Sequence, residues 1–258
     1  MIPAPDSKAI ITVENLRKSY GAFEAVKGIS FSVQEGEIFG LLGPNGAGKS
    51  TTLEIMETLR PKTSGRVLIG GFDLDQAPES IKKMIGVQLQ ASGYYPGLNL
   101  LELIQLFAGL YNRTANPMEL LAKVNLQDKA KNKFKELSGG QKQRFSIATT
   151  LINQPKVIFL DEPTTGLDPQ ARRNLWDLVR DIRQQGTTVI ITTHYMDEAE
   201  QLCDRIAIMD EGRIVAMNHP GQLIDNLLAE GFTRPQAVKG ANLEDVFIHL
   251  TGKEIREE

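Results

Sequence analysis

The nine residues GPNGAGKST have the composition and spacing of a phosphate-binding loop. Glycines let successive backbone N–H groups point at one anion, and the N-terminus of a following helix adds about half a positive charge. Lys49 can reach the outer phosphates of a nucleotide, and the Ser50 hydroxyl can coordinate Mg²⁺. A simple glycine-rich turn would not need a lysine followed by hydroxyls at this spacing. The sequence therefore predicts a nucleotide site formed by Gly43, Pro44, Asn45, Gly46, Ala47, Gly48, Lys49, Ser50 and Thr51.

Two adjacent carboxylates follow another apolar run, VIFL. Asp161 ends this predicted strand, so its side chain should emerge at the carboxyl edge of a sheet, where open α/β folds bind ligands. A carboxylate at that place can hold Mg²⁺, and Glu162 can lie near the terminal phosphate and activate the attacking water. The two acids could instead cap the next helix, but PTTGLDP intervenes before it. We therefore predict Asp161 as a metal ligand and Glu162 as a catalytic residue.

A histidine follows the next apolar run, TTVIITT, on what should be the same edge of the sheet. His194 can cap the helix that begins YMDEAE, or it can donate a hydrogen bond to the terminal phosphate. Both interpretations stay open at this point. His219 and His249 stand in contexts without partner residues, and we interpret them as structural.

The stretch LSGGQKQR predicts a second anion site at the start of a helix. A capping box explains a serine followed three residues later by a glutamine. It does not explain two glycines in the first turn, or Lys142 and Arg144 near the positive end of the helix dipole. One chain has no evident second phosphate, so we expect two chains to pair head to tail. Each would cover the other's nucleotide with Ser138, Gly139, Gly140 and Gln141.

The elements that position these residues follow from hydrophobic periodicity. The first seventy or so residues alternate apolar and polar side chains, which predicts antiparallel strands. Helical spacing prevails from Leu100 to about Asn153, and two continuous apolar runs separated by the helix QARRNLWDLVRDIRQQG then predict a parallel sheet. We predict an α/β fold with a P-loop NTPase core and mostly parallel sheet, an N-terminal antiparallel β subdomain and an inserted α-helical subdomain. The nucleotide-binding domain should span 1–235, with the helical subdomain at about 92–153, and a C-terminal helical tail 236–258.

Composition narrows the function classes. A net charge of −3, from 29 basic and 32 acidic residues, disfavours a surface that coats nucleic acid. Cys203 is the one cysteine, and its helical spacing with Ala199 and Leu202 predicts a small core residue rather than a reactive thiol. No apolar run approaches the ~20 residues of a membrane-spanning helix. We expect that the chain does not cross a membrane by itself.

GPNGAGKST, LSGGQ, VIFLDEP and a lone histidine after a strand occur in the order and spacing of the ATP-binding cassette (ABC) family, which the chain resembles from Tyr20 to about Met217. The resemblance implies that Tyr20 stacks on adenine, that Gln90 senses metal and water as a further ligand, and that Asp168 contacts the opposite subunit. Tyr20 can alternatively be part of a turn, and Asp168 also suits a helix N-cap. Gln88 can alternatively be the sensor, since both glutamines occupy the strand end. Leu89, before Gln90, stands where the family commonly has proline.

The tail NLEDVFIHLTGKEIREE looks like the end of ATPase subunits of ABC-2 type exporters, including the drug-resistance class. The resemblance implies an ATP- and Mg²⁺-dependent ATPase that drives a separate transmembrane permease, working with a second copy of itself or a paralogous subunit. It also implies a cytoplasmic protein, peripheral on the cytoplasmic face of the plasma (inner) membrane. The segment ASGYYPGLN is a candidate docking surface for the permease. The alternative is an ABC ATPase that acts on nucleic acid or ribosomes, but no nucleic acid is expected here. A soluble P-loop kinase would leave LSGGQ unexplained.

Overall fold

The structure is a computed structural model, and its description covers residues 9–88 and 93–233. The chain divides into two compact units, Met1–Leu223 and Ile224–Glu258. The predicted boundary at residue 235 stays a prediction, and the predicted tail helix of 236–258 lies outside the described residues, as does Gln90. In the described part of the chain, no helix is both long and apolar enough to cross a bilayer.

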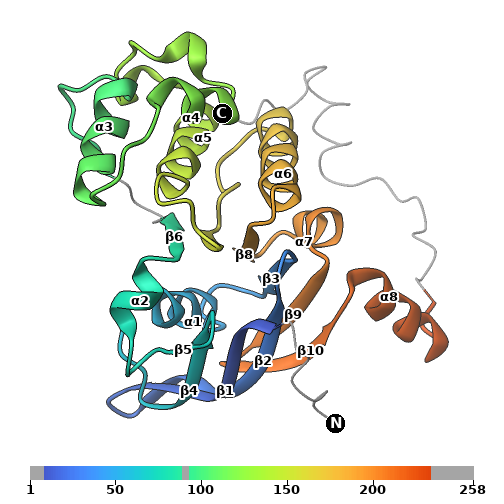
Figure 1. Cartoon of the computed structure of the whole chain (residues 1–258). Helices are drawn as coiled ribbons and strands as arrows, with labels where there is room; N and C mark the ends of the chain where they lie inside the picture. The colour runs from blue at the N-terminus through green and yellow to red at the C-terminus, as the bar shows by residue number, and fades with distance from the viewer. Residues whose placement is uncertain (1–8, 89–92, 234–258) are drawn as a thin grey trace, which may run out of the picture. The chain divides into compact units, whose positions relative to one another are not determined.

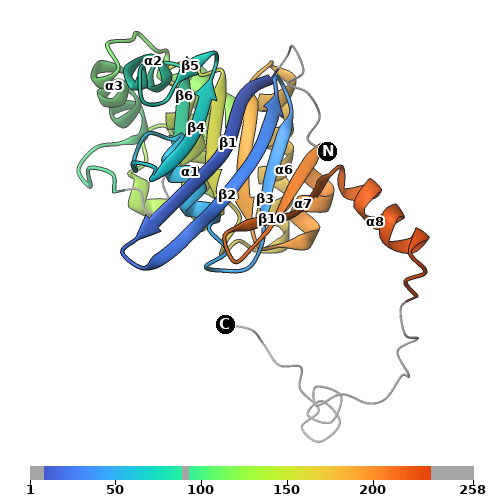
Figure 2. The same ribbon diagram turned by 90° about the horizontal axis from the view of Figure 1, so that it is seen from below.

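A four-stranded antiparallel sheet forms the first layer of the larger unit (Figure 2). Its long strands alternate between buried and solvent-facing side chains, because one face packs on the core and the other meets water. In spatial order it comprises β2 (Phe23–Gln34), β1 (Ala9–Tyr20), β4 (Ser64–Ile69) and β5 (Phe72–Asp73). The antiparallel subdomain predicted from the sequence is confirmed.

A second sheet of six strands forms the centre of this unit. Its spatial order is β10 (Arg213–Asn218), β9 (Arg205–Asp210), β3 (Ile38–Leu42), β8 (Thr188–Thr193), β7 (Val157–Asp161) and β6 (Ile85–Gln88). All neighbouring pairs are parallel except β9 with β10. Strands β3 and β8 are buried throughout, which explains their continuous apolar sequences.

Helices connect the strands and cover the sheets (Figure 1). Three of them, inserted between β6 and β7, make the predicted helical subdomain: α3 (Leu100–Leu110), α4 (Pro117–Lys123) and α5 (Gly139–Thr150). The others are α1 (Lys49–Met56), α2 (Pro78–Lys82), α6 (Pro169–Gln184), α7 (Met196–Leu202) and α8 (Pro220–Ala229). Short 3₁₀ turns occupy Gln127–Lys129 and Phe134–Glu136. The predicted α/β fold is thus confirmed.

The central sheet separates two hydrophobic cores. Along β7, Val157 and Phe159 face the core shared with α1 and the antiparallel sheet. Ile158 and Leu160 face the core shared with α3 to α6. Because successive residues of a strand point to opposite faces, one apolar run supplies both cores.

One edge of the central sheet collects the predicted chemistry. Leu42 of β3 pairs with Thr193 of β8, and Thr192 pairs with Asp161 of β7. The carboxyl ends of β3, β8 and β7 are therefore level. The glycine-rich loop follows β3, His194 follows β8, and Glu162 follows β7. Parallel pairing therefore brings together residues that lie up to about 150 positions apart in the sequence.

Cys203 packs in the core, as its sequence spacing predicts. Its side chain is 5% exposed, and its sulfur lies so near Gly40 that a Cβ on that glycine would come within 2.7 Å. Burial, reinforced by the nearby acidic side chains of Glu198 and Asp204, raises the pKa of the thiol well above its ordinary value. The folded chain therefore holds Cys203 as an unreactive thiol.

Alkylation measures this directly. We expect Cys203 of the folded protein to react with iodoacetamide at pH 8 at least about 100-fold more slowly than in denaturant, because both access and thiolate formation are suppressed. Mass spectrometry of timed samples gives the two rates. Rapid labelling under native conditions would contradict the packing described here.

Candidate functional site

The glycine-rich loop joins β3 to α1 and depends on its glycines for steric reasons. Gly46 and Gly48 have φ values of 83° and 96°, in the left-handed region. A Cβ on Gly43 would lie 2.2 Å from the Met209 carbonyl oxygen, and one on Gly48 would lie 2.6 Å from that of Ala25. Gly48 is the N-cap of α1 and offers no side chain to its first turn. The N-terminus of α1 is thus left without a side-chain cap, as an anion site requires.

Lys49 lies beneath this loop. Its side chain is 4% exposed, and its Nζ donates to the carbonyl oxygens of Gly43 at 2.9 Å and Pro44 at 3.0 Å. The same Nζ lies 3.5 Å from Oε1 of Glu162. A buried ammonium needs partners of this kind, and here the partners hold it at the centre of the loop.

Two hard oxygen ligands meet beside the loop. The Ser50 hydroxyl donates to Oδ1 of Asp161 at 3.2 Å. The Thr192 hydroxyl also donates to this Oδ1. A hydroxyl and a carboxylate suit Mg²⁺, which usually takes one or two protein ligands and completes its octahedron with water and substrate phosphates. Within the described residues no group of three or more His, Cys, Asp or Glu side chains could hold a metal, so a bound Mg²⁺ here would need the nucleotide.

Glu162 is the first residue beyond β7, and its backbone has an unusual conformation. Its φ is 45°, in the left-handed region that non-glycine residues seldom adopt, and such strain concentrates at functional sites. Its N–H donates to the carbonyl and hydroxyl oxygens of Thr192. This turn directs the carboxylate toward the loop, where Oε1 meets Lys49 and Oε2 lies 3.2 Å from Nδ1 of His194.

His194 does not cap the following helix. Tyr195 is the N-cap of α7, and no side chain makes a capping hydrogen bond there. The capping interpretation of His194 is therefore wrong, because its ring turns instead toward Glu162. Its side chain remains 31% exposed, but His194 is not among the residues that line the nucleotide pocket.

The nucleotide pocket has a volume of about 400 Å³. Its walls combine the glycine-rich loop with two aromatic residues of the antiparallel sheet. The lining residues are Tyr20, Phe23, Ala25, Asn45, Gly46, Gly48, Lys49, Ser50, Thr51 and Glu162. The predicted site residues Tyr20 and Glu162 thus reach the same pocket as the loop.

Aromatic groups at the pocket entrance include one that sequence reasoning missed. The Tyr20 ring is 40% exposed and lies within 5.0 Å of the Lys18 Nζ and 5.4 Å of the Arg60 guanidinium. Phe23, across a two-residue turn, is 64% exposed and lines the pocket as well. The signal that could have found Phe23 is an aromatic residue directly after the two-residue turn that follows Tyr20. Thr192 was also missed, although two threonines, Thr192 and Thr193, end the buried run that precedes His194.

Ser138 is the N-cap residue of α5 and forms a capping box with Gln141. Ser138 Oγ accepts from the Gln141 N–H at 3.3 Å, and Gln141 Oε1 accepts from the Ser138 N–H at 3.0 Å. A Cβ on Gly140 would lie 3.0 Å from the Cβ of Ala171 on α6, so close packing is one reason for that glycine. None of Ser138, Gly139, Gly140 or Gln141 lines the nucleotide pocket of its own chain.

One part of the predicted second anion site is wrong. Arg144 donates to the carbonyl oxygens of Val124 and Asn125 at 3.3 and 3.2 Å, so it binds the end of α4 rather than an anion. Lys142 lies 6.0 Å over the Phe134 ring. The first turn of α5 therefore offers its backbone amides and Ser138 without the guanidinium.

Two further predicted residues have clear positions. Asp168 is the N-cap of α6, where its Oδ1 accepts from the Ala171 N–H at 2.8 Å; its contact with an opposite subunit stays a prediction. Gln88 ends β6 and is 3% exposed. It pairs with Leu160, one residue before Asp161. Because Gln90 is outside the described residues, the choice of sensor glutamine stays open.

A family model and the similar proteins of known name all indicate an ABC transporter ATP-binding protein. A family model described as ABC transporter matches residues 26–165. The linearmycin resistance ATP-binding protein of Bacillus subtilis is 40% identical over 223 residues, covering 84% of this chain and 72% of the relative. The Nod factor export ATP-binding protein I of Burkholderia orbicola is 35% identical over 303 residues, covering 97% and 100%.

Solved structures share the fold. A cassette of Clostridium perfringens, part of an ABC transporter complex, superposes with a TM-score of 0.77 at 29% identity, covering 85% of this chain and 92% of that one. A dimeric cassette in a post-hydrolysis state, bound to ADP and phosphate, superposes with a TM-score of 0.73 at 29% identity, covering 81% and 98%. The range matched by the family model, residues 26–165, includes the glycine-rich loop, Asp161 and Glu162.

Proposed function

The chain belongs to the ABC transporter family as its ATP-binding, ATP-hydrolysing subunit, and on that premise we propose that two such subunits close on MgATP to drive a separate membrane-spanning permease. The second subunit is another copy of this chain or a close relative. A permease partner places the working protein at the cytoplasmic face of the plasma (inner) membrane. The export relatives favour an ABC-2 type exporter.

The observation that carries the hydrolytic role is the cluster of Lys49, Glu162 and His194 beside Ser50 and Asp161. Before nucleotide arrives, Lys49 is held by two loop carbonyls and by Glu162. A terminal phosphate entering the loop offers Lys49 a stronger anionic partner, which leaves the Glu162 carboxylate available to accept a proton from water.

Each remaining residue has a role in this proposal. Gly43, Pro44, Asn45, Gly46, Ala47, Gly48 and Thr51 enclose the phosphates, and Tyr20 stacks on the adenine. Ser50, Asp161 and a glutamine, Gln90 or Gln88, hold Mg²⁺, which neutralises phosphate charge when bound. Lys49 and His194 stabilise charge on the phosphoryl group during transfer. Asp168 contacts the opposite subunit.

The proposed closure of two subunits rests on the distance between the nucleotide pocket and the Ser138 helix start within one chain. The Ser138 cap leaves the first turn of α5 with bare amides, yet none of Ser138, Gly139, Gly140 and Gln141 reaches the nucleotide pocket of its own chain. A second chain could bring its Ser138 helix to the exposed side of the nucleotide. The dimeric ADP- and phosphate-bound relative supports this arrangement.

Purification from membranes tests the proposal. Tagged protein extracted in mild detergent should hydrolyse MgATP and bring with it one integral membrane protein, identified by mass spectrometry. A Lys49→Met variant should lose hydrolysis by about 100-fold or more but keep the membrane protein. Recovery of RNA, DNA or ribosomes in place of a membrane protein would favour the nucleic-acid alternative and contradict this one.

A further inference from the structure

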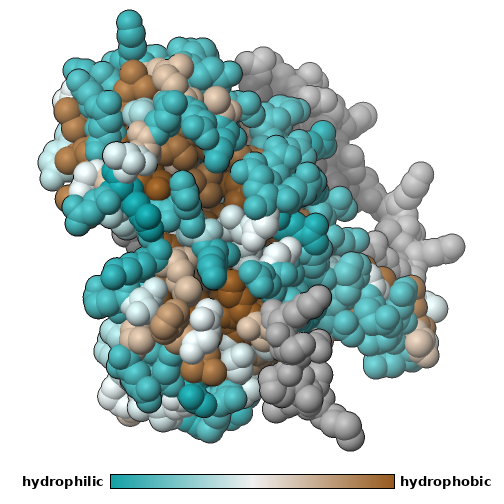
Figure 3. Space-filling model, viewed as in Figure 1, coloured by the Kyte–Doolittle hydropathy of each residue, from teal (hydrophilic) through white to brown (hydrophobic). Residues whose placement is uncertain are grey.

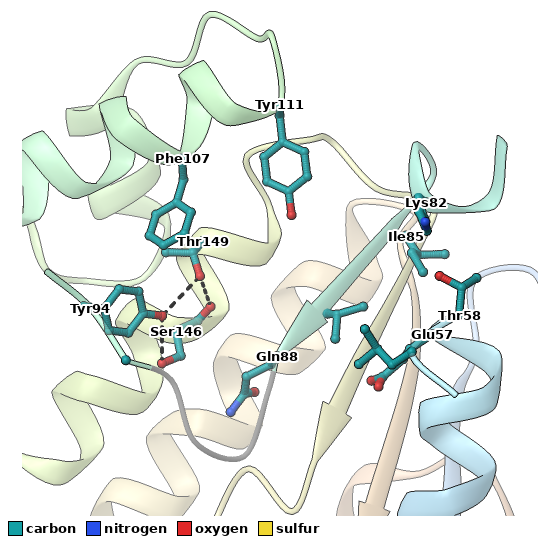
Figure 4. Close-up of a pocket in the computed structure, with 13 residues that line it drawn as sticks. Glu57, Thr58, Lys82, Ile85, Gln88, Tyr94, Phe107, Tyr111, Ser146 and Thr149 are labelled. Atoms are coloured by element: carbon teal, nitrogen blue, oxygen red, sulfur yellow. Dashed lines mark hydrogen bonds between the residues drawn. The ribbon is translucent and has the colours of Figure 1, made fainter. Parts of the chain in front are cut away.

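In the part of the chain that the structure describes, buried side-chain nitrogen and oxygen atoms without a hydrogen-bond partner occur in two groups. One group, on Glu57, Thr58 and Gln88, borders the partly apolar hollow of about 430 Å³ between α1 and the inserted helices (Figures 3 and 4). The other group comprises Thr164 Oγ1, Arg172 Nε, His194 Nδ1 and Glu198 Oε2. Because native proteins pair nearly all such atoms, four unpaired ones beside the candidate site indicate a place whose geometry serves function rather than stability.

Glu198 belongs to the second group and is fully buried. It lies on α7, four residues after His194, and is 0% exposed, whereas the neighbouring acidic residues Asp197 and Glu200 are exposed. An acidic side chain in the first turn of a helix stabilises the helix from the surface, as Asp197 can do. Burying a carboxyl costs free energy unless other groups pair with it. The position of Glu198 must therefore be explained by its contacts inside the protein.

The Glu198 carboxyl adjoins three other segments of the chain. Trp176 of α6 donates its Nε1–H to Oε1 at 3.0 Å. Burial raises the pKa of the carboxyl, while the hydroxyls of Thr193 and Thr164, at the end of β8 and in the turn after β7, approach it and lower its pKa. Oε2 and the Thr164 hydroxyl do not reach full hydrogen-bond geometry. One buried side chain thus connects α7 with α6, with β8 and with the turn that follows β7.

Two of these segments carry the proposed catalytic pair. Thr193 directly precedes His194, and its Oγ1 accepts at 3.0 Å from the backbone N–H that follows the histidine, so its side chain spans the histidine backbone. Thr164 follows Glu162 by two residues and is 1% exposed. Because both threonines adjoin Glu198, its carboxyl lies behind both members of the pair.

The ring of His194 depends on its surroundings for its orientation. Its Nδ1 lies 3.2 Å from Oε2 of Glu162 but makes no aligned hydrogen bond. The Tyr195 ring packs beside the imidazole, with 4.1 Å between the ring centroids and 38° between the ring planes. The Arg172 guanidinium of α6 in turn lies 4.5 Å from the centroid of the Tyr195 ring. Since packing rather than hydrogen bonding holds the imidazole, a shift of the backbone between β8 and α7 would move it.

We propose that Glu198 is a positioning residue for ATP hydrolysis, because its carboxyl holds the backbone of His194 in place beside Glu162. This inference rests on the catalytic roles proposed above for His194 and Glu162. Glu198 does not line the nucleotide pocket, so it acts on the rate of the chemical step and not on nucleotide binding. Misplacing a catalytic group by about 1 Å can lower a rate by about 100-fold.

Two substitutions of Glu198 separate positioning from stability. Glu198→Met fills a similar volume but accepts no hydrogen bond, and we expect its kcat for MgATP to fall by at least about 30-fold while KM stays within twofold. An apolar residue of similar volume often leaves the fold stable when it replaces a buried ionisable one, and thermal unfolding followed by circular dichroism checks this. Glu198→Gln keeps an acceptor for the Trp176 N–H and should retain at least about a third of the wild-type kcat. Equal losses in both variants, no loss in either, or a raised KM with unchanged kcat overturns the inference.

A double-mutant cycle with His194→Ala shows whether Glu198 acts through the histidine. In the His194→Ala background, Glu198→Met should lower kcat by less than about threefold, because the ring that it would misplace is gone. A further fall of about 30-fold would mean that Glu198 acts on another group and would overturn the inference. Glu200→Met is the matched control, since it removes an exposed carboxylate from the same helix, and its kcat should stay within twofold of the wild type.

Nuclear magnetic resonance of protein labelled with ¹³C at its three histidines reports on the ring directly. The His194 resonance, assigned by its loss in His194→Ala, should shift in Glu198→Met and keep its wild-type position in Glu200→Met. An unchanged His194 resonance in Glu198→Met overturns the inference, because the ring would then be placed without Glu198.

A substitution of the partner residue applies if Glu198→Met does not fold. Trp176→Phe removes the N–H that donates to Glu198 Oε1 but keeps an aromatic ring, and should lower kcat by about fivefold with KM unchanged. A wild-type kcat in this variant overturns the inference. Wild-type hydrolysis by His194→Ala would instead contradict the proposed catalytic role of His194 itself, so the two failures are distinguishable.

Discussion

Replacing Glu162 by glutamine should lower the rate of ATP hydrolysis by about 1000-fold while MgATP remains bound. Among the described residues that line the nucleotide pocket, Glu162 is the one acidic residue. Its left-handed backbone conformation directs the carboxylate toward Lys49. An amide of the same shape can still hydrogen-bond to His194 but cannot accept a proton from water. Because the phosphate contacts of the loop are untouched, binding persists and the dimer should accumulate in its nucleotide-bound form.

Three measurements check this expectation: phosphate release, nucleotide affinity and dimer fraction by light scattering in MgATP. Glu200→Gln, which removes an exposed carboxylate of the neighbouring α7, is the control and should behave like the wild type. Phosphate release at the normal rate from Glu162→Gln would remove Glu162 from the mechanism. A variant that stays monomeric in saturating MgATP, alone and with its permease, would contradict the closure proposed here.

Local sequence patterns predicted most of the fold, because the spacing of apolar residues in each segment reflects which of its faces are buried. The apolar runs of β7 and β8 are continuous since the sheet is covered on both faces. The helix α6 buries Leu175, Leu178, Val179 and Ile182, the stripe that its periodicity indicates. Neighbouring parallel strands end at the same edge of a sheet. Once the runs ending in Asp161 and Thr193 are predicted as such strands, the site is expected at that edge, and the observed pairing agrees.

Side-chain direction was harder to predict than position. The spacing of Arg144 in its helix suggested an anion contact, but the open carbonyls at the end of α4 compete for the guanidinium and bind it. His194 stood before a helix and could have capped it, yet the strained turn at Glu162 offers it a carboxylate. In both cases the deciding partner comes from a distant segment, which no local pattern contains.

Mixing two inactive variants should restore activity if each nucleotide is shared between two chains. Ser138→Asp keeps an N-cap oxygen for α5 but places a negative charge against the phosphate. Lys49→Met fills the volume of the buried lysine without its charge. Each variant alone should hydrolyse MgATP at about 1% of the wild-type rate or less. In an equal mixture, random pairing makes half of the dimers mixed, and each has one site with both Lys49 and Ser138 intact, so about a quarter of the wild-type rate should return.

A second mixture distinguishes shared sites from an artefact of reassociation. When the wild type is mixed equally with the double variant Ser138→Asp/Lys49→Met, a mixed dimer contains no intact shared site, because every Lys49 faces a changed Ser138 or the reverse. Activity should then fall to about a quarter of the wild-type value, whereas sites contained within one chain would leave about half. No recovery in the first mixture, together with half activity in the second, would place each nucleotide site in a single chain. Recovery in the first and a quarter in the second can arise only if the Ser138 helix of one chain completes the P-loop site of another.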